Sequence, residues 1–147
     1  MSRLYLSPPD VGSAEVEFVL EAFESNWVAP IGPQLDAFER EFAEVVGSRH
    51  AVGVSSGTAA LHASLLAAGI QPGDEVVVPS FTFSATAGAV VLAGGKPAFA
   101  DIDADTYCIT RESIEAVLTR ATKAIMPVHM YGLCADMDPI TELAHNR

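Results

Sequence analysis

The chain has 147 residues, of which 50% are hydrophobic and 18% are charged, and its formal net charge is −11. This acidic excess argues against nucleic acid and anionic membrane surfaces as partners, because both would repel the protein. No apolar run reaches membrane-spanning length, no secretory signal pattern begins the chain, and Cys108 and Cys134 are widely spaced, so we expect a cytoplasmic protein with reduced thiols.

The first third of the chain predicts two amphipathic helices joined by a loop. Hydrophobic residues recur at helical spacing from Ser13 to Ser25 and again from Leu35 to Val46, and Gly47 ends the second helix. Between the helices, Asn26 to Pro33 (NWVAPIGP) is expected to be a loop, because its Pro and Gly residues interrupt regular structure. We assign residues 1–48 to an N-terminal helical segment.

From residue 49 to residue 147, short strands alternate with helices. The strand runs are apolar without alternation, as expected for strands that helices cover on both faces. This rhythm predicts an α/β fold of three layers, with a largely parallel sheet flanked by helices. A last helix is expected to begin with Asp138 as its N-cap and Pro139 at its first position. The predicted strands are residues 51–54, 75–79, 97–100 and 124–128, and the predicted helices between them are 59–68, 84–92 and 111–120.

The segment GVSSGTAAL, residues 53–61, joins the first predicted strand to a helix and allows three interpretations. It can bind a phosphate group, because Gly57 permits close approach while the first helical N–H groups and the Thr58 hydroxyl can donate hydrogen bonds. It can also be a strand–helix junction without a ligand. Lastly, Gly-x-Ser-x-Gly around Ser55 matches the nucleophile elbow of α/β-hydrolases, although the oxyanion loop of those enzymes is missing upstream.

The segment PSFTFSAT, residues 79–86, follows the second predicted strand. Open α/β sheets bind their ligands at the carboxyl ends of the strands. Phe81 or Phe83 could therefore stack on a flat cofactor ring, or both could cap the hydrophobic core.

Two polar segments follow the next two strands. The carboxylates of Asp101, Asp103 and Asp105 could bind a metal ion or form a solvated Asx turn, and the Gly and Glu of a calcium loop are absent at the required offsets. His129 could transfer protons or shape its loop through a hydrogen bond. No set of His, Cys, Asp and Glu residues has metal-ligand spacing, so we expect no metal site.

Five motifs, taken together and in order, resemble the nucleotide-sugar aminotransferases of the DegT/StrS family, which are fold-type-I enzymes that use pyridoxal 5′-phosphate (PLP). The resemblance extends over almost the whole chain and implies the N-terminal portion of the large domain of that fold. It also implies transfer of an amino group, with glutamate as the donor, to a keto sugar linked to a nucleotide, by a homodimer. The motifs are SNWVAPIGP, SSGTAALHASLLAAG, PGDEVVVPSFTFSATA, GGKPAFADIDADTYCIT and TKAIMPVHMYGLCADMDPI.

The resemblance also implies roles for matched residues. Gly57 and Thr58 would bind the cofactor phosphate, and Phe83 would stack on the pyridine ring. The loop that carries Asn26, Trp27 and Pro30 would lie near the nucleotide-sugar substrate. His129 belongs to a matched motif, but no catalytic role is assigned to it.

The match stops before the segments in which this family carries the acidic partner of the pyridine nitrogen and the Schiff-base lysine. The chain's only lysines, Lys96 and Lys123, begin strand runs and do not match that motif. We therefore assign no catalytic residue here, and we expect an N-terminal fragment that is inactive alone, because its last helix leads to no further strand. The alternatives are a sugar dehydratase of the same family, in which His replaces that lysine, and a non-catalytic remnant or interaction module.

Overall fold

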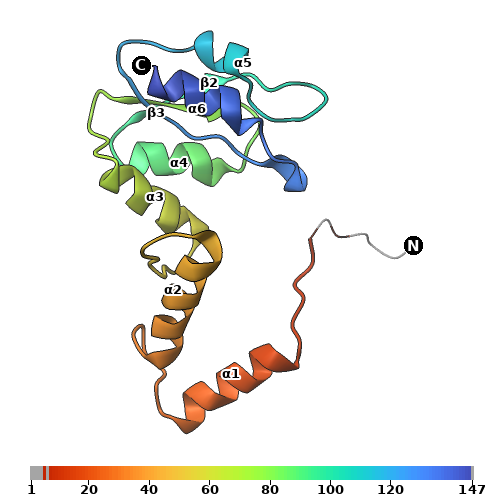
Figure 1. The fold of residues 1–147 in the computed structure, drawn as a ribbon. Coiled ribbons are helices and arrows are strands. Elements are labelled where there is room, and N and C mark those ends of the chain that lie inside the picture. Colours follow the sequence, from red (N-terminus) through yellow and green to blue (C-terminus); the bar gives the residue numbers. More distant parts are fainter. Residues whose placement is uncertain (1–4, 6, 147) are drawn as a thin grey trace. The chain divides into compact units, whose positions relative to one another are not determined.

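A computed structural model describes residue 5 and residues 7–146 (Figure 1). The chain divides into two compact units, one that ends at Gly53 and one that begins at Val54. Within the described residues, no helix is both long enough and apolar enough to cross a membrane.

The first unit contains the two expected helices, α1 (Ser13–Glu24) and α2 (Pro33–Val46). The Glu15 side chain accepts a hydrogen bond from the Gly12 backbone N–H at 2.7 Å, which satisfies one of the free N–H groups at the start of α1. Gly47 ends α2 in the left-handed conformation, with φ of 67°, as the sequence predicts. The two helices are joined by a hydrogen bond of 2.8 Å from Gln34 Nε2 to the backbone oxygen of Phe18.

The second unit is built around a parallel sheet of three strands in the order β2-β1-β3, with β1 at Glu75–Pro79, β2 at Lys96–Ala100 and β3 at Thr122–Ile125. The whole of β1 is buried, because the sheet continues on both of its sides and helices cover both of its faces. This confirms the predicted α/β architecture.

Two helix layers enclose the sheet (Figure 1). On one face, α3 (Gly57–Ala67) and α4 (Ser84–Leu92) cover Val76 and Val78 of the central strand. On the other face, α5 (Arg111–Glu115) and α6 (Met137–His145) cover Val77. Successive strand residues point to opposite faces, so three adjacent valines serve two cores. A short 3₁₀ turn, η1 (Met130–Gly132), lies between β3 and α6.

The predicted strand at residues 51–54 is wrong, because this segment is not in a strand. A strand needs a neighbouring backbone to complete its hydrogen bonds. Here the N–H of Gly53 instead donates to the Glu39 side chain at 2.7 Å. The carboxylate of α2 thus takes the place of a partner strand at this residue.

Other element boundaries also differ from the prediction, among them those of α5, β3 and α6. α5 ends at Glu115 rather than near Arg120, and Thr119 beyond it donates a hydrogen bond to the Glu75 side chain. β3 ends before Pro127, which has no N–H to extend a ladder. α6 begins two residues before Pro139 and follows Asp136, not Asp138; proline is tolerated there because the N–H groups of the first turn have no acceptor within the helix.

At the amino ends of the strands, Glu75 connects β1 to β2 and to the loop between α5 and β3. Its carboxylate pairs with Lys96 of β2 at 3.0 Å and accepts a hydrogen bond of 2.6 Å from the Thr119 hydroxyl. These two partners, the Thr119 hydroxyl first, hold the pKa of Glu75 below its ordinary value. The amino edge of the sheet is therefore a satisfied structural network.

Candidate functional site

The start of α3 is open to a ligand. Ser56 is the N-cap, and its hydroxyl accepts a hydrogen bond of 3.2 Å from the Ala59 N–H. Among the described residues, the backbone N–H groups of Gly57 and Thr58 have no hydrogen-bond acceptor. No acidic residue lies in the first turn, and a Cβ placed on Gly57 would meet no atom within 4 Å. This donor set and the positive end of an 11-residue helix suit an anion.

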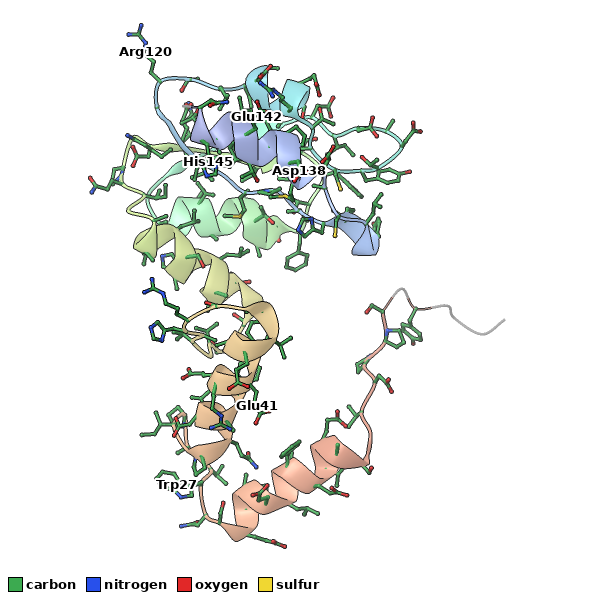
Figure 2. The ribbon with its side chains drawn as sticks, in the orientation of Figure 1. Trp27, Glu41, Arg120, Asp138, Glu142 and His145 are labelled. Carbon is green, nitrogen blue, oxygen red and sulfur yellow. The ribbon has the colours of Figure 1, made fainter. Side chains whose placement is uncertain are left out.

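The nucleophile-elbow interpretation of Ser55 loses its structural basis. An elbow requires a strand that turns sharply into a helix, and the segment before Ser55 is not a strand. His145, which with Asp101 or Asp136 would imitate the chain order of a catalytic triad, lies at the C-terminal end of α6 (Figure 2). Within the described residues, no hydrogen bond joins Ser55 to a histidine or an aspartate.

Phe83 lies at the start of α4, four residues after the end of β1. It is 77% exposed, so it does not cap the hydrophobic core. Its neighbour Thr82 forms a hydrogen bond of 2.8 Å with the hydroxyl of Thr86, which is buried in α4. The structure thus presents an open aromatic face at the carboxyl end of the central strand.

The start of α3 and Phe83 lie at the same edge of the sheet. The C-terminal end of α3 connects through residues 68–74 to the amino end of β1. The opposite end of α3, with Gly57 and Thr58, therefore points toward the carboxyl edge. α4 begins directly after β1 leaves that edge, and α3 and α4 cover the same sheet face (Figure 1).

The acidic segment after β2 is a hydrogen-bonded turn. Asp103 Oδ1 accepts hydrogen bonds from the N–H groups of Asp105 and Thr106, at 3.0 and 2.9 Å, and from the Thr106 hydroxyl at 3.1 Å. The Thr106 N–H, followed by its hydroxyl and the Asp105 N–H, lowers the pKa of Asp103. This confirms the Asx-turn interpretation for Asp103. In the part of the chain that the structure describes, no group of three or more His, Cys, Asp or Glu residues could bind a metal ion.

His129 shapes the loop after β3. Its Nδ1 accepts a hydrogen bond of 3.1 Å from the N–H of Ala135, across the turn that contains η1. Nδ1 of His129 therefore acts as an acceptor that shapes the loop, which is one of the two roles that the sequence allowed.

The three predicted substrate residues share one loop of the first unit, between α1 and α2. Asn26 adopts a left-handed conformation with φ of 61°. Trp27 is 52% exposed and lies against Gly32, where an added Cβ would approach Trp27 Cε3 to 3.3 Å (Figure 2). Pro30 is also exposed. The tryptophan ring therefore anchors the loop and leaves part of its surface free.

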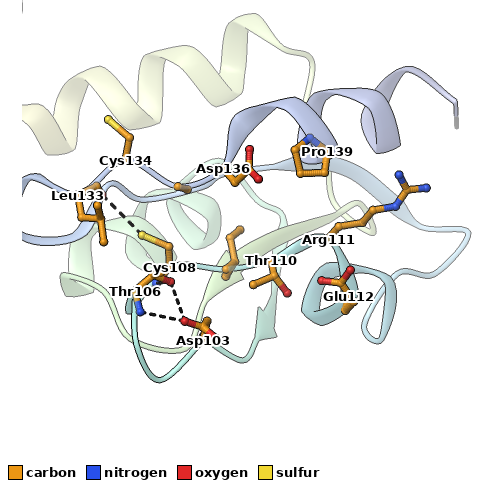
Figure 3. A pocket seen from close by; sticks show the side chains of 12 residues that line it. Asp103, Thr106, Cys108, Thr110, Arg111, Glu112, Leu133, Cys134, Asp136 and Pro139 are labelled. Carbon is orange, nitrogen blue, oxygen red and sulfur yellow. Dashed lines mark hydrogen bonds between the residues drawn. The ribbon is translucent and has the colours of Figure 1, made fainter.

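A pocket of about 470 Å³ lies between the acidic turn and α6 (Figure 3). Two of its charged side chains already have partners. Asp103 accepts the hydrogen bonds of its own turn, and Arg111 pairs with Glu115 at 3.0 Å and with Glu142 at 3.2 Å, which raises the pKa of Arg111. The buried Cys108 thiol donates to the backbone oxygen of Leu133 at 3.7 Å. We assign no ligand to this pocket.

Sequence reasoning missed Tyr107 and Tyr131, whose rings contact Phe81. Both tyrosines have positive φ, of 57° and 53°. The only signal in the sequence is the Gly that follows Tyr131, because Gly is common in such turns. The contacts themselves join three separate loops and leave no local pattern.

Known proteins resemble this chain in sequence and in structure. Residues 9–147 match the family model described as the DegT/DnrJ/EryC1/StrS aminotransferase family. The chain is 43% identical to the GDP-perosamine synthase of Caulobacter vibrioides over 99% of its own length and 40% of that protein. An aminotransferase structure from Psychrobacter cryohalolentis has a TM-score of 0.88 at 42% identity. The match covers 95% of this chain and 36% of the Psychrobacter chain. The PLP form of Spr1654 from Streptococcus pneumoniae has a TM-score of 0.90 at 32% identity. That match covers 99% of this chain and 37% of the Spr1654 chain. The chain therefore spans about 40% of the length of the curated relative.

Proposed function

The chain belongs to the DegT/DnrJ/EryC1/StrS aminotransferase family, and from this premise we propose that it holds the phosphate and the ring of PLP in an aminotransferase that acts on a nucleotide-linked keto sugar. The single observation that carries the proposal is that free hydrogen-bond donors and an exposed aromatic ring lie at one edge of one sheet. The relatives support the reaction class, because one is a GDP-perosamine synthase and others are aminotransferases.

The residues at the start of α3 fit the phosphate of PLP. The N–H groups of Gly57 and Thr58, which have no acceptor among the described residues, favour a dianionic group together with the Thr58 hydroxyl and the helix dipole. No carboxylate in the first turn opposes it. Gly57 leaves open space for the phosphate oxygens. A cationic ligand would be repelled by this end of the helix.

Phe83 fits the pyridine ring. Its side chain is exposed and follows the central strand, so one of its faces can stack on a flat ring whose phosphate lies at α3. Bound PLP would supply an electron sink for the transfer of an amino group. The residues of this chain would bind and orient the cofactor, while the proton-transferring lysine is expected from the part of the family pattern that this chain does not match.

The loop with Asn26, Trp27 and Pro30 would contact the nucleotide-sugar substrate. The exposed part of the Trp27 ring can cover an apolar sugar or base face, and the Asn26 amide can donate or accept a hydrogen bond. We propose glutamate as the amino donor. We also propose a homodimer, for which the exposed apolar residues of α1, such as Val16 and Phe18, offer a contact surface. Cys108 and Cys134 are free thiols, which supports a reducing, cytoplasmic location.

The test is a titration of the full-length protein with PLP, followed by a transamination assay with glutamate and a panel of nucleotide-linked keto sugars. We expect saturable PLP binding that Thr58→Val weakens and Thr58→Ser preserves, since serine keeps the hydroxyl. We expect turnover with at least one keto sugar and none without PLP. A parent protein that binds no PLP would overturn the proposal.

A further inference from the structure

Three aromatic side chains from three loops meet at the carboxyl edge of the sheet. Phe81 follows β1, Tyr107 follows β2 and Tyr131 follows β3. The ring centroids of Phe81 and Tyr107 lie 5.9 Å apart at an interplanar angle of 49°. Those of Phe81 and Tyr131 lie 6.3 Å apart in an edge-to-face arrangement of 61°. Both geometries are favourable for aromatic pairs, and we call these three residues the aromatic cluster.

Two members of the aromatic cluster adopt an unfavourable backbone. Tyr107 and Tyr131 have φ of 57° and 53°, a region that bulky L residues rarely adopt. Such strain persists where the surroundings demand it, and it often marks functional sites. Burial does not demand it here, because Tyr107 is 48% exposed and Tyr131 is 66% exposed. What both conformations achieve is contact with Phe81.

Phe81 belongs to the same short loop as Phe83. The beginning of that loop is fixed by a hydrogen bond of 2.8 Å from Ser80 N–H to the Ala100 oxygen, and its end is fixed by the Thr82–Thr86 pair. The Phe83 ring is exposed and has no hydrogen-bonding group that could hold it in place. The direction of its ring therefore depends on how firmly its neighbours are held.

We propose that the aromatic cluster positions Phe83 for the cofactor: Tyr107 and Tyr131 clamp Phe81 and thereby fix the loop that presents the Phe83 ring. This inference rests on the proposed function, since it takes the PLP ring as the partner of Phe83. Direct stacking of a nucleotide on the tyrosines is disfavoured, because two nearby carboxylates would repel a diphosphate. Asp101 accepts a hydrogen bond from Ser80, next to Phe81, and the backbone oxygen of Asp103 accepts one from the Tyr107 N–H. Tyr107, Tyr131 and Phe81 are positioning residues.

The first experiment measures PLP affinity in the full-length protein. Phe81→Leu and Tyr131→Leu keep an apolar side chain but remove the ring. Each should raise the Kd for PLP about 3- to 10-fold, and Phe83→Leu should raise it by a similar factor. Residues that act through one another are not additive. Adding Phe81→Leu to Phe83→Leu should therefore weaken binding no further, whereas adding it to Thr58→Val should multiply the two effects.

Matched controls separate the ring from other losses. Tyr131→Phe keeps the ring and should bind PLP like the parent. Phe99→Leu removes a 54%-exposed aromatic of β2 outside the aromatic cluster and should also bind like the parent. If Tyr131→Leu unfolds, Tyr131→Asn replaces it, because Asn tolerates the left-handed conformation and still lacks the ring.

The second experiment needs no cofactor. 4-Fluorophenylalanine at position 83 reports the mobility of that ring by ¹⁹F NMR, and the signal should sharpen in Phe81→Leu and Tyr131→Leu but not in Phe99→Leu. A parent that binds no PLP overturns the proposed function. If the parent binds PLP, any of four results would overturn the positioning role. The cluster variants could bind PLP as tightly as the parent, or the effects of Phe81→Leu and Phe83→Leu on the Kd for PLP could multiply. Alternatively, only the KM for the nucleotide sugar could change, or the ¹⁹F signal could stay the same.

Discussion

The two edges of the sheet are built from the same three strands but are finished in opposite ways. At the amino edge, the Glu75 carboxylate meets Lys96 and Thr119, so each of these polar groups has a partner. At the carboxyl edge, two N–H groups of α3 have no acceptor among the described residues, Phe83 is exposed and two tyrosines are strained. A parallel sheet gives all strands the same direction, so one edge can hold the fold together while the other stays available for a ligand.

The largest expected effect belongs to the carboxyl edge. In the full-length protein, Thr58→Val should weaken PLP binding by about 1.5–3 kcal/mol, because it removes a donor to a charged phosphate. Thr58→Ser should bind like the parent. The melting temperature without PLP should stay near that of the parent, since Thr58 is exposed. Absorbance titration measures the PLP affinity and a thermal melt measures the melting temperature. A large fall in the melting temperature of Thr58→Val would show that the carboxyl edge also stabilises the fold, which would contradict the difference between the two edges.

A smaller effect is expected at Phe83. Phe83→Ala should weaken PLP binding by about 0.5–1.5 kcal/mol beyond the loss of contact area, because one stacking face disappears. Phe83→Tyr keeps that face and serves as the control. The ring and the phosphate are separate contacts, so the double variant with Thr58→Val should show the sum of the two losses. If both single variants bind PLP like the parent, the cofactor lies elsewhere.

The amino edge should show a pH effect and no effect on PLP. The pKa of Glu75 is held below its ordinary value of 4.5 in the fold, so its charged form stabilises the fold above that pH and the contribution is lost as the pH falls through the lower, folded pKa. Glu75→Gln cannot titrate, so its unfolding free energy should fall less steeply on acidification below pH 4.5. Glu115→Gln, in an exposed ion pair, is the control. Urea unfolding at several pH values measures this, and parallel curves for parent and Glu75→Gln would contradict it.

The last prediction about the two edges is that PLP forms no stable adduct with the two lysines of the chain. Lys96 is the first residue of β2 and Lys123 the second of β3, so both lie at the edge opposite the proposed site. Incubation with PLP and reduction with borohydride should leave both without stoichiometric label in a peptide map. Stoichiometric label on either lysine would show that the amino edge also takes the cofactor.

The sequence predicted the central parts of this fold better than its edges. Val76 to Val78 form an unbroken apolar run that is typical of a buried strand, and β1 has the bounds that were predicted for it. Residues 51–54 have the same apolar character, yet a strand also depends on a neighbour that no local pattern reveals. The start of α6 was misplaced because Pro139 is acceptable anywhere in the first turn.

The candidate site divides in the same way. Gly57 and Thr58 could be named because the start of a helix leaves a local signal, whereas Phe83 was preferred to Phe81 only through the family resemblance. The aromatic cluster could not be named, since the rings of Tyr107 and Tyr131 reach Phe81 only after two crossovers have brought three loops together. Local sequence thus identifies groups that act alone and misses groups that act through one another.

The strand order β2-β1-β3 also has a consequence for the time course of folding. Glu75 pairs with Lys96, 21 residues away, and with Thr122, more than twice as far along the chain. Closing the longer loop costs more chain entropy, so the β1–α4–β2 unit should assemble first and β3 should dock onto it later. Pulse-labelling hydrogen exchange would show early protection at the Ala98 N–H and later protection at the Met126 N–H, which donates to the Val77 oxygen at 2.8 Å. Simultaneous protection would refute this order. Until β3 docks, one side of the buried central strand is an unpaired edge, so the interval between the two steps is when a newly made chain is most prone to aggregate.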